Sequence, residues 1–254
     1  MHYKFPTRPE LLRDIRAAAE TFILPDYTPE FPILPKSASV VTAGSCFADN
    51  IAATLLGLGM ETHTISIVEG LNSPLATLDM IRRLSDGDDG GIAGHARLAR
   101  ASLLVLTVGV AIHPFLHGHP IFAFGRENVR GLHWRMLTVE EIKEAIMMIL
   151  DEVRLISPSL KTVISISPIP LQWSKEHRSV FGQDCLSKSL IRVAVESVLS
   201  EKIKDVYYWP SFEIVRWLGG HSGPFFGTNG QDARHIDQNV LDIIMSLFIR
   251  RYFY

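Results

Sequence analysis

The sequence has few cysteines and no long hydrophobic run, and both shortages limit what the protein can be. Only Cys46 and Cys185 occur among 254 residues, so there is no disulfide framework of the kind that small secreted domains use. The most apolar stretch, residues 101–110, has about half of the roughly 20 residues that a membrane-spanning helix needs. The first 22 residues mix charged and short apolar pieces, unlike a signal peptide. These absences predict a cytoplasmic protein without a membrane span.

An excess of one charge is also missing. Lys and Arg number 25 against 27 Asp and Glu, a formal net charge of −2, and no dense basic run occurs. Nucleic-acid-binding domains typically carry a basic patch, so we expect no nucleic-acid partner. In contrast, 47% of the residues are hydrophobic, which at this length favours one large domain with a sizeable core.

The hydrophobic pattern alternates between short strands and amphipathic helices. Strands are expected at residues 39–43, 60–67, 103–108, 162–167 and 205–209, and helices at 47–58, 74–84, 140–155, 185–199 and 235–250. Strands that alternate with helices predict a parallel sheet covered on both faces. We therefore expect a single three-layer α/β/α domain of about five strands over residues 37–254.

Three segments lack such a pattern. Residues 1–36 contain six of the 14 prolines and are expected to form an irregular N-terminal arm. Residues 109–135 and the glycine-rich residues 219–232 are expected to be irregular as well. Segments 109–135 and 168–184 each follow a strand and are longer than ordinary connections, so both should form walls of a pocket at the carboxyl edge of the sheet.

Ser45 lies between the first expected strand and the first expected helix. Ligands of open parallel sheets bind outside the carboxyl ends of the strands. A serine there can project its hydroxyl from a tight turn, beside backbone N–H groups that could hold an oxyanion. A serine in the same place can also be a plain helix N-cap, and position alone does not decide between the two.

Asp232 and His235 precede the last expected helix. Three positions apart on one turn, the carboxylate can fix the tautomer of the imidazole, as the orienting acid and the base of a serine triad do. Such a pair is common by chance, and its weight comes from its place beside the last helix and from its pairing with Ser45. His221, in a glycine-rich setting without an adjacent acid, is the rival base.

The sequence around Ser45 resembles that of a known family. Residues 44–48 read GSCFA, the signature of the GSCFA family, a branch of the SGNH/GDSL-like hydrolases. Further segments similar to family motifs follow in order: SISPI at 165–169, SKSLIR at 187–192, YWPSFEI at 208–214 and DARH at 232–235. The resemblance implies a flavodoxin-like sheet of the SGNH hydrolase fold. It also implies Ser45 as nucleophile, His235 as general base and Asp232 as its orienter.

The resemblance further implies an oxyanion hole. One donor is the Ser45 amide, and a second is a backbone amide after the second strand, for which Gly70 is the best match. The third donor in SGNH enzymes is usually an asparagine side chain after the third strand, where this chain has Gly109 followed by Val110. Asn72, in the neighbouring loop, is the available amide.

Other candidates have ordinary explanations. His113, His117 and His119 fit no recognised zinc spacing, and we expect them beside the mouth of the site rather than at a metal. No metal or cofactor is expected. Cys46 is expected to be a small buried thiol directed into the first helix.

Three other side chains could act near the site. Trp173 and Trp217 lie in loop-like segments where a sugar could stack on them. Glu213 could buttress the loop that carries Asp232, or could simply lie on the surface.

These features predict a serine ester hydrolase acting through an acyl-Ser45 intermediate, on a short acyl ester of a carbohydrate or similar alcohol. With a sugar hydroxyl in place of water as acceptor, the same residues would make an O-acyltransferase. A non-catalytic glycan-binding protein with a decayed triad is the alternative of a different class. The expected partner is a small-molecule or carbohydrate ester, and the sequence makes no prediction of oligomeric state.

Overall fold

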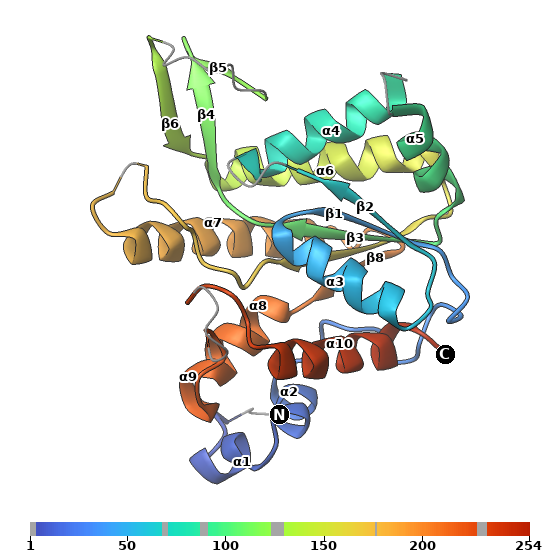
Figure 1. The fold of residues 1–254 in the computed structure, drawn as a ribbon, viewed down its shortest axis with the longest axis vertical. Helices are drawn as coiled ribbons and strands as arrows, with labels where there is room; N and C mark the ends of the chain where they lie inside the picture. Colours follow the sequence, from blue (N-terminus) through green and yellow to red (C-terminus); the bar gives the residue numbers. More distant parts are fainter. Residues whose placement is uncertain (1–3, 68–70, 87–90, 123–129, 176, 228–232) are drawn as a thin grey trace.

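A computed structural model describes residues 4–254 except 68–70, 87–90, 123–129, 176 and 228–232. A five-stranded parallel sheet with the order β2-β1-β3-β7-β8 lies at its centre (Figure 1). The strands are β1 (Val40–Gly44), β2 (Thr62–Ser66), β3 (Leu103–Val108), β7 (Lys161–Ile166) and β8 (Val206–Trp209). This is the flavodoxin-like order, and it confirms the predicted fold class.

The central strands are apolar because both of their faces are covered. Every residue of β1 and of β3 is buried, as is typical of parallel strands between two helical layers. The predicted strand at 103–108 coincides with β3, and each of the other four predicted strands overlaps its observed strand with ends within two residues. Near-continuous runs of Val, Leu and Ile made these strands easy to predict.

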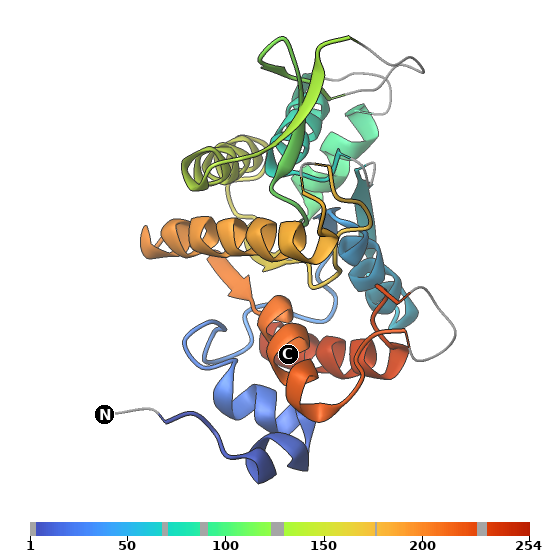
Figure 2. The same cartoon turned by 90° about the vertical axis from the view of Figure 1, so that its left-hand side faces the viewer.

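Helices cover the two faces of the sheet with separate hydrophobic clusters (Figures 1 and 2). On one face lie α3 (Cys46–Gly57) and α10 (Gln238–Tyr252). On the other lie α4 (Pro74–Asp86), α5 (Gly91–Arg100), α6 (Val139–Ile156) and α7 (Val180–Ser200). No helix in the described part of the chain is both long and apolar enough to cross a membrane.

The segment after β3 is not irregular, contrary to our expectation for residues 109–135. Its described part forms an antiparallel sheet with the order β5-β4-β6. The strands are β4 (Ile112–Leu116), β5 (His119–Pro120) and β6 (Leu132–Met136). His117 and Gly118, both with positive φ (51° and 84°), make the two-residue turn between β4 and β5. A glycine in such a two-residue turn is a hairpin signal that the sequence did contain.

The N-terminal arm is also more regular than expected. It contains α1 (Arg8–Arg13), which lies against α2 and α9, and α2 (Ile15–Phe22), which lies beside α10 (Figures 1 and 2). Pro9 lies in the first turn of α1, where a missing N–H costs no hydrogen bond. Ala18 and Ala19 of α2 are buried in the same cluster as α10. The expectation of an irregular arm is therefore wrong for α1 and α2, but it holds for residues 23–36, which contain the other four prolines.

A helical stretch also replaces the beginning of the expected glycine-rich loop. After β8 the chain forms α8 (Ser211–Glu213), a π-helical turn η2 (Ile214–Leu218) and α9 (Gly219–Ser222). Ile214, Val215 and Leu218 of η2 are buried and hold this stretch against the core. The expectation of a loop from residue 219 is wrong for its first four residues.

Candidate active site

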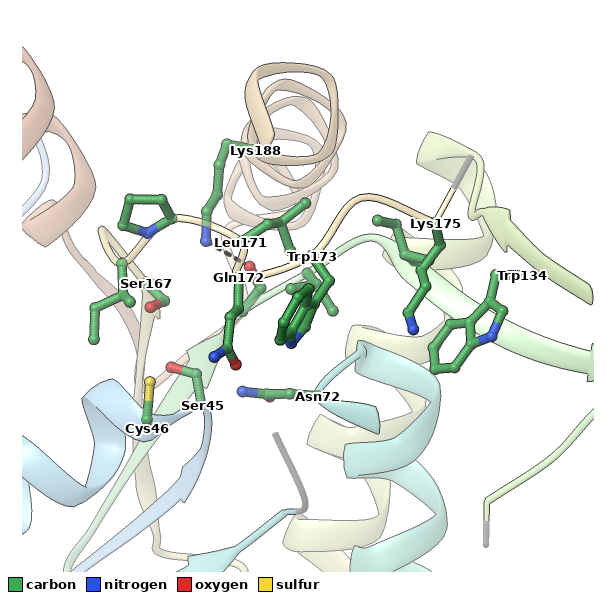
Figure 3. Close-up of a pocket in the computed structure, with 15 residues that line it drawn as sticks. Ser45, Cys46, Asn72, Trp134, Ser167, Leu171, Gln172, Trp173, Lys175 and Lys188 are labelled. Atoms are coloured by element: carbon green, nitrogen blue, oxygen red, sulfur yellow. Dashed lines mark hydrogen bonds between the residues drawn. The ribbon is translucent and has the colours of Figure 1, made fainter. Parts of the chain in front are cut away.

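A cavity of about 160 Å³ opens at the carboxyl edge of the parallel sheet (Figure 3). Its polar floor comes from residues that follow three strands: Ser45 after β1, Gly109 after β3 and Ser167 after β7. The walls come from the two long segments, through Trp134 of β6 and Trp173 of the loop before α7 among others. The predicted position of both segments at this edge is confirmed for their described parts.

Gly44 places Ser45 at the end of β1. Its φ is +116°, and a Cβ at this position would lie 2.0 Å from the carbonyl oxygen of Thr107 on β3. Only glycine fits there. Ser45 itself is extended and caps α3, because its Oγ accepts a hydrogen bond from the Phe47 N–H at 3.3 Å. The N-cap interpretation is therefore correct, and it does not exclude a nucleophile, since the buried side chain also faces the cavity.

Thr107 is a partner of Ser45 that the sequence analysis did not single out. The two hydroxyl oxygens are 2.9 Å apart. The Ser45 N–H donates to Thr107 Oγ1 at 2.7 Å and to the Thr107 carbonyl oxygen at 3.2 Å. The amide that we expected to act as an oxyanion donor is thus directed to β3. A threonine near the end of the otherwise apolar strand LLVLTV was the available signal.

Asn72 lies across the cavity floor from Ser45. A Cβ on Gly109 would be 2.9 Å from Asn72 Nδ2 and 3.1 Å from Ser45 Cβ, so the glycine leaves room for these two side chains to approach. Asn72 is buried, and its Oδ1 has no hydrogen-bond partner among the described residues. Figure 3 shows the nitrogen end of the Asn72 amide turned toward Ser45. The structure therefore brings together the predicted residues Ser45, Asn72 and Gly109.

The loop that carries Asn72 is held from two sides. The Val110 N–H donates to the Asn72 carbonyl oxygen at 3.1 Å. The next residue, Ser73, has its Oγ 2.7 Å from His113 Nδ1 and accepts from the Ala76 N–H at 3.3 Å. Burial lowers the pKa of His113 to about 4, so the ring is neutral near pH 7. His113 is thus a structural residue of β4 that fixes the start of α4.

Lys188 is the second residue that the sequence analysis left without a role. It extends from α7 and donates from Nζ to the Gly109 carbonyl oxygen at 2.6 Å (Figure 3). The side chain is buried, and this burial lowers its pKa to about 8, although the nearby Asp184 acts in the opposite direction. The signal was its spacing, because Lys188 shares the buried face of α7 with Ile191 and Val195.

The triad of Ser45, His235 and Asp232 stays a prediction. Asp232 lies outside the described residues, as does Gly70. His235 is exposed, in the turn before α10, and is not among the described residues that line the cavity. Near the other end of α10, the Tyr252 carbonyl oxygen accepts from the N–H groups of residues 33 and 34, which lead into β1. The start of α10 therefore lies toward the carboxyl edge of the sheet (Figure 1).

The remaining candidates fall in different places. Cys46 is only half-buried and lines the cavity beside Ser45, so our expectation that it points into the helix is wrong. Trp173 lines the cavity and is 67% exposed, whereas Trp217 is exposed and is not part of that lining.

Glu213 links two elements beside the site. It accepts hydrogen bonds from the Tyr208 hydroxyl on β8 (2.9 and 2.8 Å) and from Arg192 Nε on α7 (2.7 Å). Its side chain is 14% exposed, so it is not a surface residue. These contacts fasten α7, the helix that carries Lys188, to strand β8 at the edge of the sheet.

Comparison with known proteins bears on family and fold. Residues 92–248, more than half of the chain, match the profile of the GSCFA family. No curated protein matches the sequence. A GDSL-like lipase from Parabacteroides merdae aligns with a TM-score of 0.50 at 11% identity, over 86% of this chain and 97% of that one.

Two further solved structures are similar at lower scores. A GDSL-like lipase from Bacteroides thetaiotaomicron gives a TM-score of 0.45 at 13% identity, over 84% of this chain and 86% of that one. A family two carbohydrate esterase from Clostridium thermocellum gives 0.45 at 13% identity, over 84% and 63%. At 11% identity, the similarity to the Parabacteroides merdae structure bears on the fold alone.

Proposed function

Since the chain belongs to the GSCFA family, we propose that it is an SGNH-type serine ester hydrolase in which Ser45 forms a covalent acyl intermediate. One observation carries the proposal: the Ser45 side chain and the Asn72 amide face each other across Gly109 on the floor of a cavity at the carboxyl edge. This arrangement provides a nucleophile and, beside it, a donor for the charge that its attack creates.

In the proposed first step, Ser45 Oγ attacks the carbonyl carbon of the ester while its proton passes to His235, with Asp232 as orienter. The Phe47 N–H donates to Ser45 Oγ from the first turn of α3, where the helix dipole also favours negative charge. The Thr107 hydroxyl is a further hydrogen-bond partner of the same oxygen. These contacts favour the developing alkoxide.

The tetrahedral intermediate then carries a negative charge on the former carbonyl oxygen. Asn72 Nδ2 is the donor that we assign to this oxyanion, because the amide lies beside Ser45 with its nitrogen turned toward it. When the intermediate collapses, the protonated His235 returns its proton to the leaving alkoxide. Water, activated in turn by His235, then attacks the acyl-Ser45 carbonyl and releases the acid.

The shape of the cavity supports a short acyl group. About 160 Å³ is small, and its rim carries the exposed Trp173. We propose that the acyl group enters the cavity and that the alcohol lies at the rim, where an indole face suits a sugar or similar ring. A sugar hydroxyl that took the place of water would turn the same steps into acyl transfer.

A non-catalytic binding protein is the second candidate. The direction of the Ser45 N–H toward Thr107 favours it, because that amide is then not a donor to an oxyanion in the cavity. A binding protein of this kind would retain the cavity and its tryptophans but would not form an acyl-enzyme.

Labelling with a fluorophosphonate probe distinguishes the two functions. We expect the wild type to be labelled and to hydrolyse a short p-nitrophenyl ester, and Ser45→Ala to lose both. Ser200→Ala, at the far end of α7, is the matched control and should retain both. Cys46→Ala tests the neighbouring thiol. Loss of labelling in Cys46→Ala, with labelling retained in Ser45→Ala, would show that Cys46 and not Ser45 is the nucleophile. An unlabelled and inactive wild type would favour the binding protein.

A further inference from the structure

The charged side chains that line the cavity are all of one sign. Among its described lining residues are two lysines, Lys175 and Lys188, and no Asp or Glu. The chain as a whole has a net charge of −2, so this concentration of positive charge does not follow from composition. A cavity lined in this way attracts anions.

Lys188 is the member of this pair that lies deepest. Its ammonium group has three N–H donors, and Gly109 accepts one of them at 2.6 Å. Among the described residues no carboxylate forms an ion pair with Lys188. Asp184, one turn earlier on α7, instead binds Arg216 at 2.6 Å and the Leu171 N–H at 2.9 Å. A buried cation without a carboxylate partner costs free energy, which an anionic ligand would offset.

The position of Lys188 indicates which part of a substrate would meet it. Its Nζ contacts the carbonyl oxygen of Gly109, and the α-carbon of the same glycine faces Ser45 and Asn72. The nucleophile and the ammonium group are therefore separated by about the width of one residue. A negative charge bound at Lys188 would lie only a few bonds from the carbonyl carbon that Ser45 attacks.

We propose that the preferred substrate is an ester of a short dicarboxylic acid, and that Lys188 binds the free carboxylate of its acyl group. The inference rests on the proposed hydrolase function and adds the substrate class to it. Succinyl and glutaryl groups carry a carboxylate two or three methylene groups from the ester carbonyl, and they are the short dicarboxylic groups that we propose. A charge-assisted hydrogen bond from Lys188 would hold the far end of the acyl chain while Asn72 meets the oxyanion at the near end.

Other polar groups of the cavity fit an anionic acyl chain. Figure 3 shows the Gln172 amide extended toward Ser45 and Asn72, where it can donate to an acyl oxygen. Lys175 lies at the rim with its Nζ 5.0 Å from the ring centroid of Trp134. This second cation would attract the anion toward the opening before Lys188 binds it.

A purely structural role for Lys188 makes a different prediction. If it only fixed the Gly109 carbonyl, its loss would disturb Ser45 and Asn72 in the same way for every ester. If it binds the acyl carboxylate, its loss would harm anionic esters more than neutral ones. The ratio of activities on two matched esters therefore separates the two roles.

The test uses mono-p-nitrophenyl glutarate and p-nitrophenyl pentanoate, whose acyl chains differ by a carboxylate in place of a methyl group. After subtraction of uncatalysed hydrolysis, kcat/KM is measured for both. We expect the glutarate-to-pentanoate ratio to fall by about tenfold or more in Lys188→Met and Lys188→Gln. Lys36→Met, an exposed lysine that leads into β1, removes the same charge at the opposite edge and should leave the ratio unchanged.

A binding measurement separates this inference from the hydrolase proposal. Calorimetric titration of Ser45→Ala with glutarate should show binding. The same titration of the double variant Ser45→Ala, Lys188→Met should show none. Glutarate binding without turnover of either ester would contradict the proposed hydrolase function but would support an anion-binding site at Lys188. An unchanged ester ratio in both Lys188 variants, or no glutarate binding, would overturn the inference, whether or not the neutral ester is hydrolysed.

Discussion

Two buried side chains, Thr107 and Lys188, hold residues of the cavity floor in place. In the sequence Thr107 was visible as a polar residue in an apolar strand, and Lys188 as part of the segment SKSLIR, without an assigned role. Hydrophobic periodicity assigns such a residue to the core but does not say which atom it will meet. Thr107 meets both Ser45 Oγ and the Ser45 N–H, and Lys188 meets Gly109. These contacts join positions far apart in the chain, so local sequence patterns could not predict them.

Thr107→Val tests the contact with Ser45. Valine keeps the shape of threonine but removes Oγ1, so Ser45 Oγ loses one partner and its N–H keeps only the longer bond to the Thr107 carbonyl oxygen. We expect a stability loss of about 1–2 kcal/mol in chemical denaturation and a kcat reduced by roughly tenfold. Thr42→Val is the control: Thr42 is buried in the adjacent strand β1, and its Oγ1 bonds to Thr64 rather than to the site. An equal fall in kcat in both variants would contradict the proposed role of the Thr107 hydroxyl at Ser45.

The charge of Lys188 predicts a pH dependence. Burial lowers its pKa from 10.5 to about 8, with Asp184 on α7 and Cys46 on α3 raising it and Arg216 on η2 lowering it. The ammonium form therefore predominates below about pH 8 and is lost above it. The glutarate-to-pentanoate ratio should decline as pH rises from 7 to about 9. Titration of the catalytic residues affects both esters alike and cancels in the ratio. A ratio that stays flat over this range, or rises, would contradict the prediction.

At the scale of elements, the end of β1 depends on a single glycine. The parallel register brings Gly44 opposite Thr107, and a Cβ there would collide with backbone rather than with a flexible side chain. We expect Gly44→Ala to destabilise the protein by about 2–4 kcal/mol in thermal or chemical unfolding. Gly57→Ala is the matched control at the other end of α3, where no atom lies within 4 Å of the added Cβ. That change should be neutral or stabilise by about 0.5–1 kcal/mol. Similar losses in both variants would show that the helix, not the turn, limits stability.

The elements that sequence reasoning placed well share a simple cause. Strands such as β3 are buried on both faces, and helices such as α6 have one apolar face and a Thr138–Glu141 capping box, so local pattern and final environment agree. The elements it missed depend on distant partners. Strands β4 and β6 form because they pair with each other, and α2 forms because Ala18 and Ala19 pack against α10. No local period in the sequence reports the pairing of β4 with β6, whereas α2 is amphipathic and begins at the N-cap Asp14, so its local signals were present and were overlooked.

At the scale of the whole molecule, the carboxyl edge is where distant segments meet. The cavity draws its lining from the ends of β1, β3 and β7, from the antiparallel sheet through Trp134 and from α7 through Lys188. Strand order therefore explains why residues separated along the chain share one site. It also explains why Ser45, Asn72 and Gly109 could be assigned to one site from the sequence, whereas the contacts of Ser45 with Thr107 and of Gly109 with Lys188 could not.

Ser45 and His235 lie near opposite ends of the sequence, and we propose that they act together as nucleophile and base. A double-mutant cycle tests this pairing. Residues that act as one catalytic unit are non-additive, so Ser45→Ala, His235→Ala and the double variant should all have the same residual kcat. Asp232→Asn should lower kcat by up to about 10⁴-fold, because the imidazole would lose its tautomer and orientation. His221→Ala, at the rival base in α9, should leave kcat unchanged. A double variant slower than the wild type by the product of the two single effects would show that Ser45 and His235 act separately. A loss in His221→Ala without one in His235→Ala would transfer the role of base to His221.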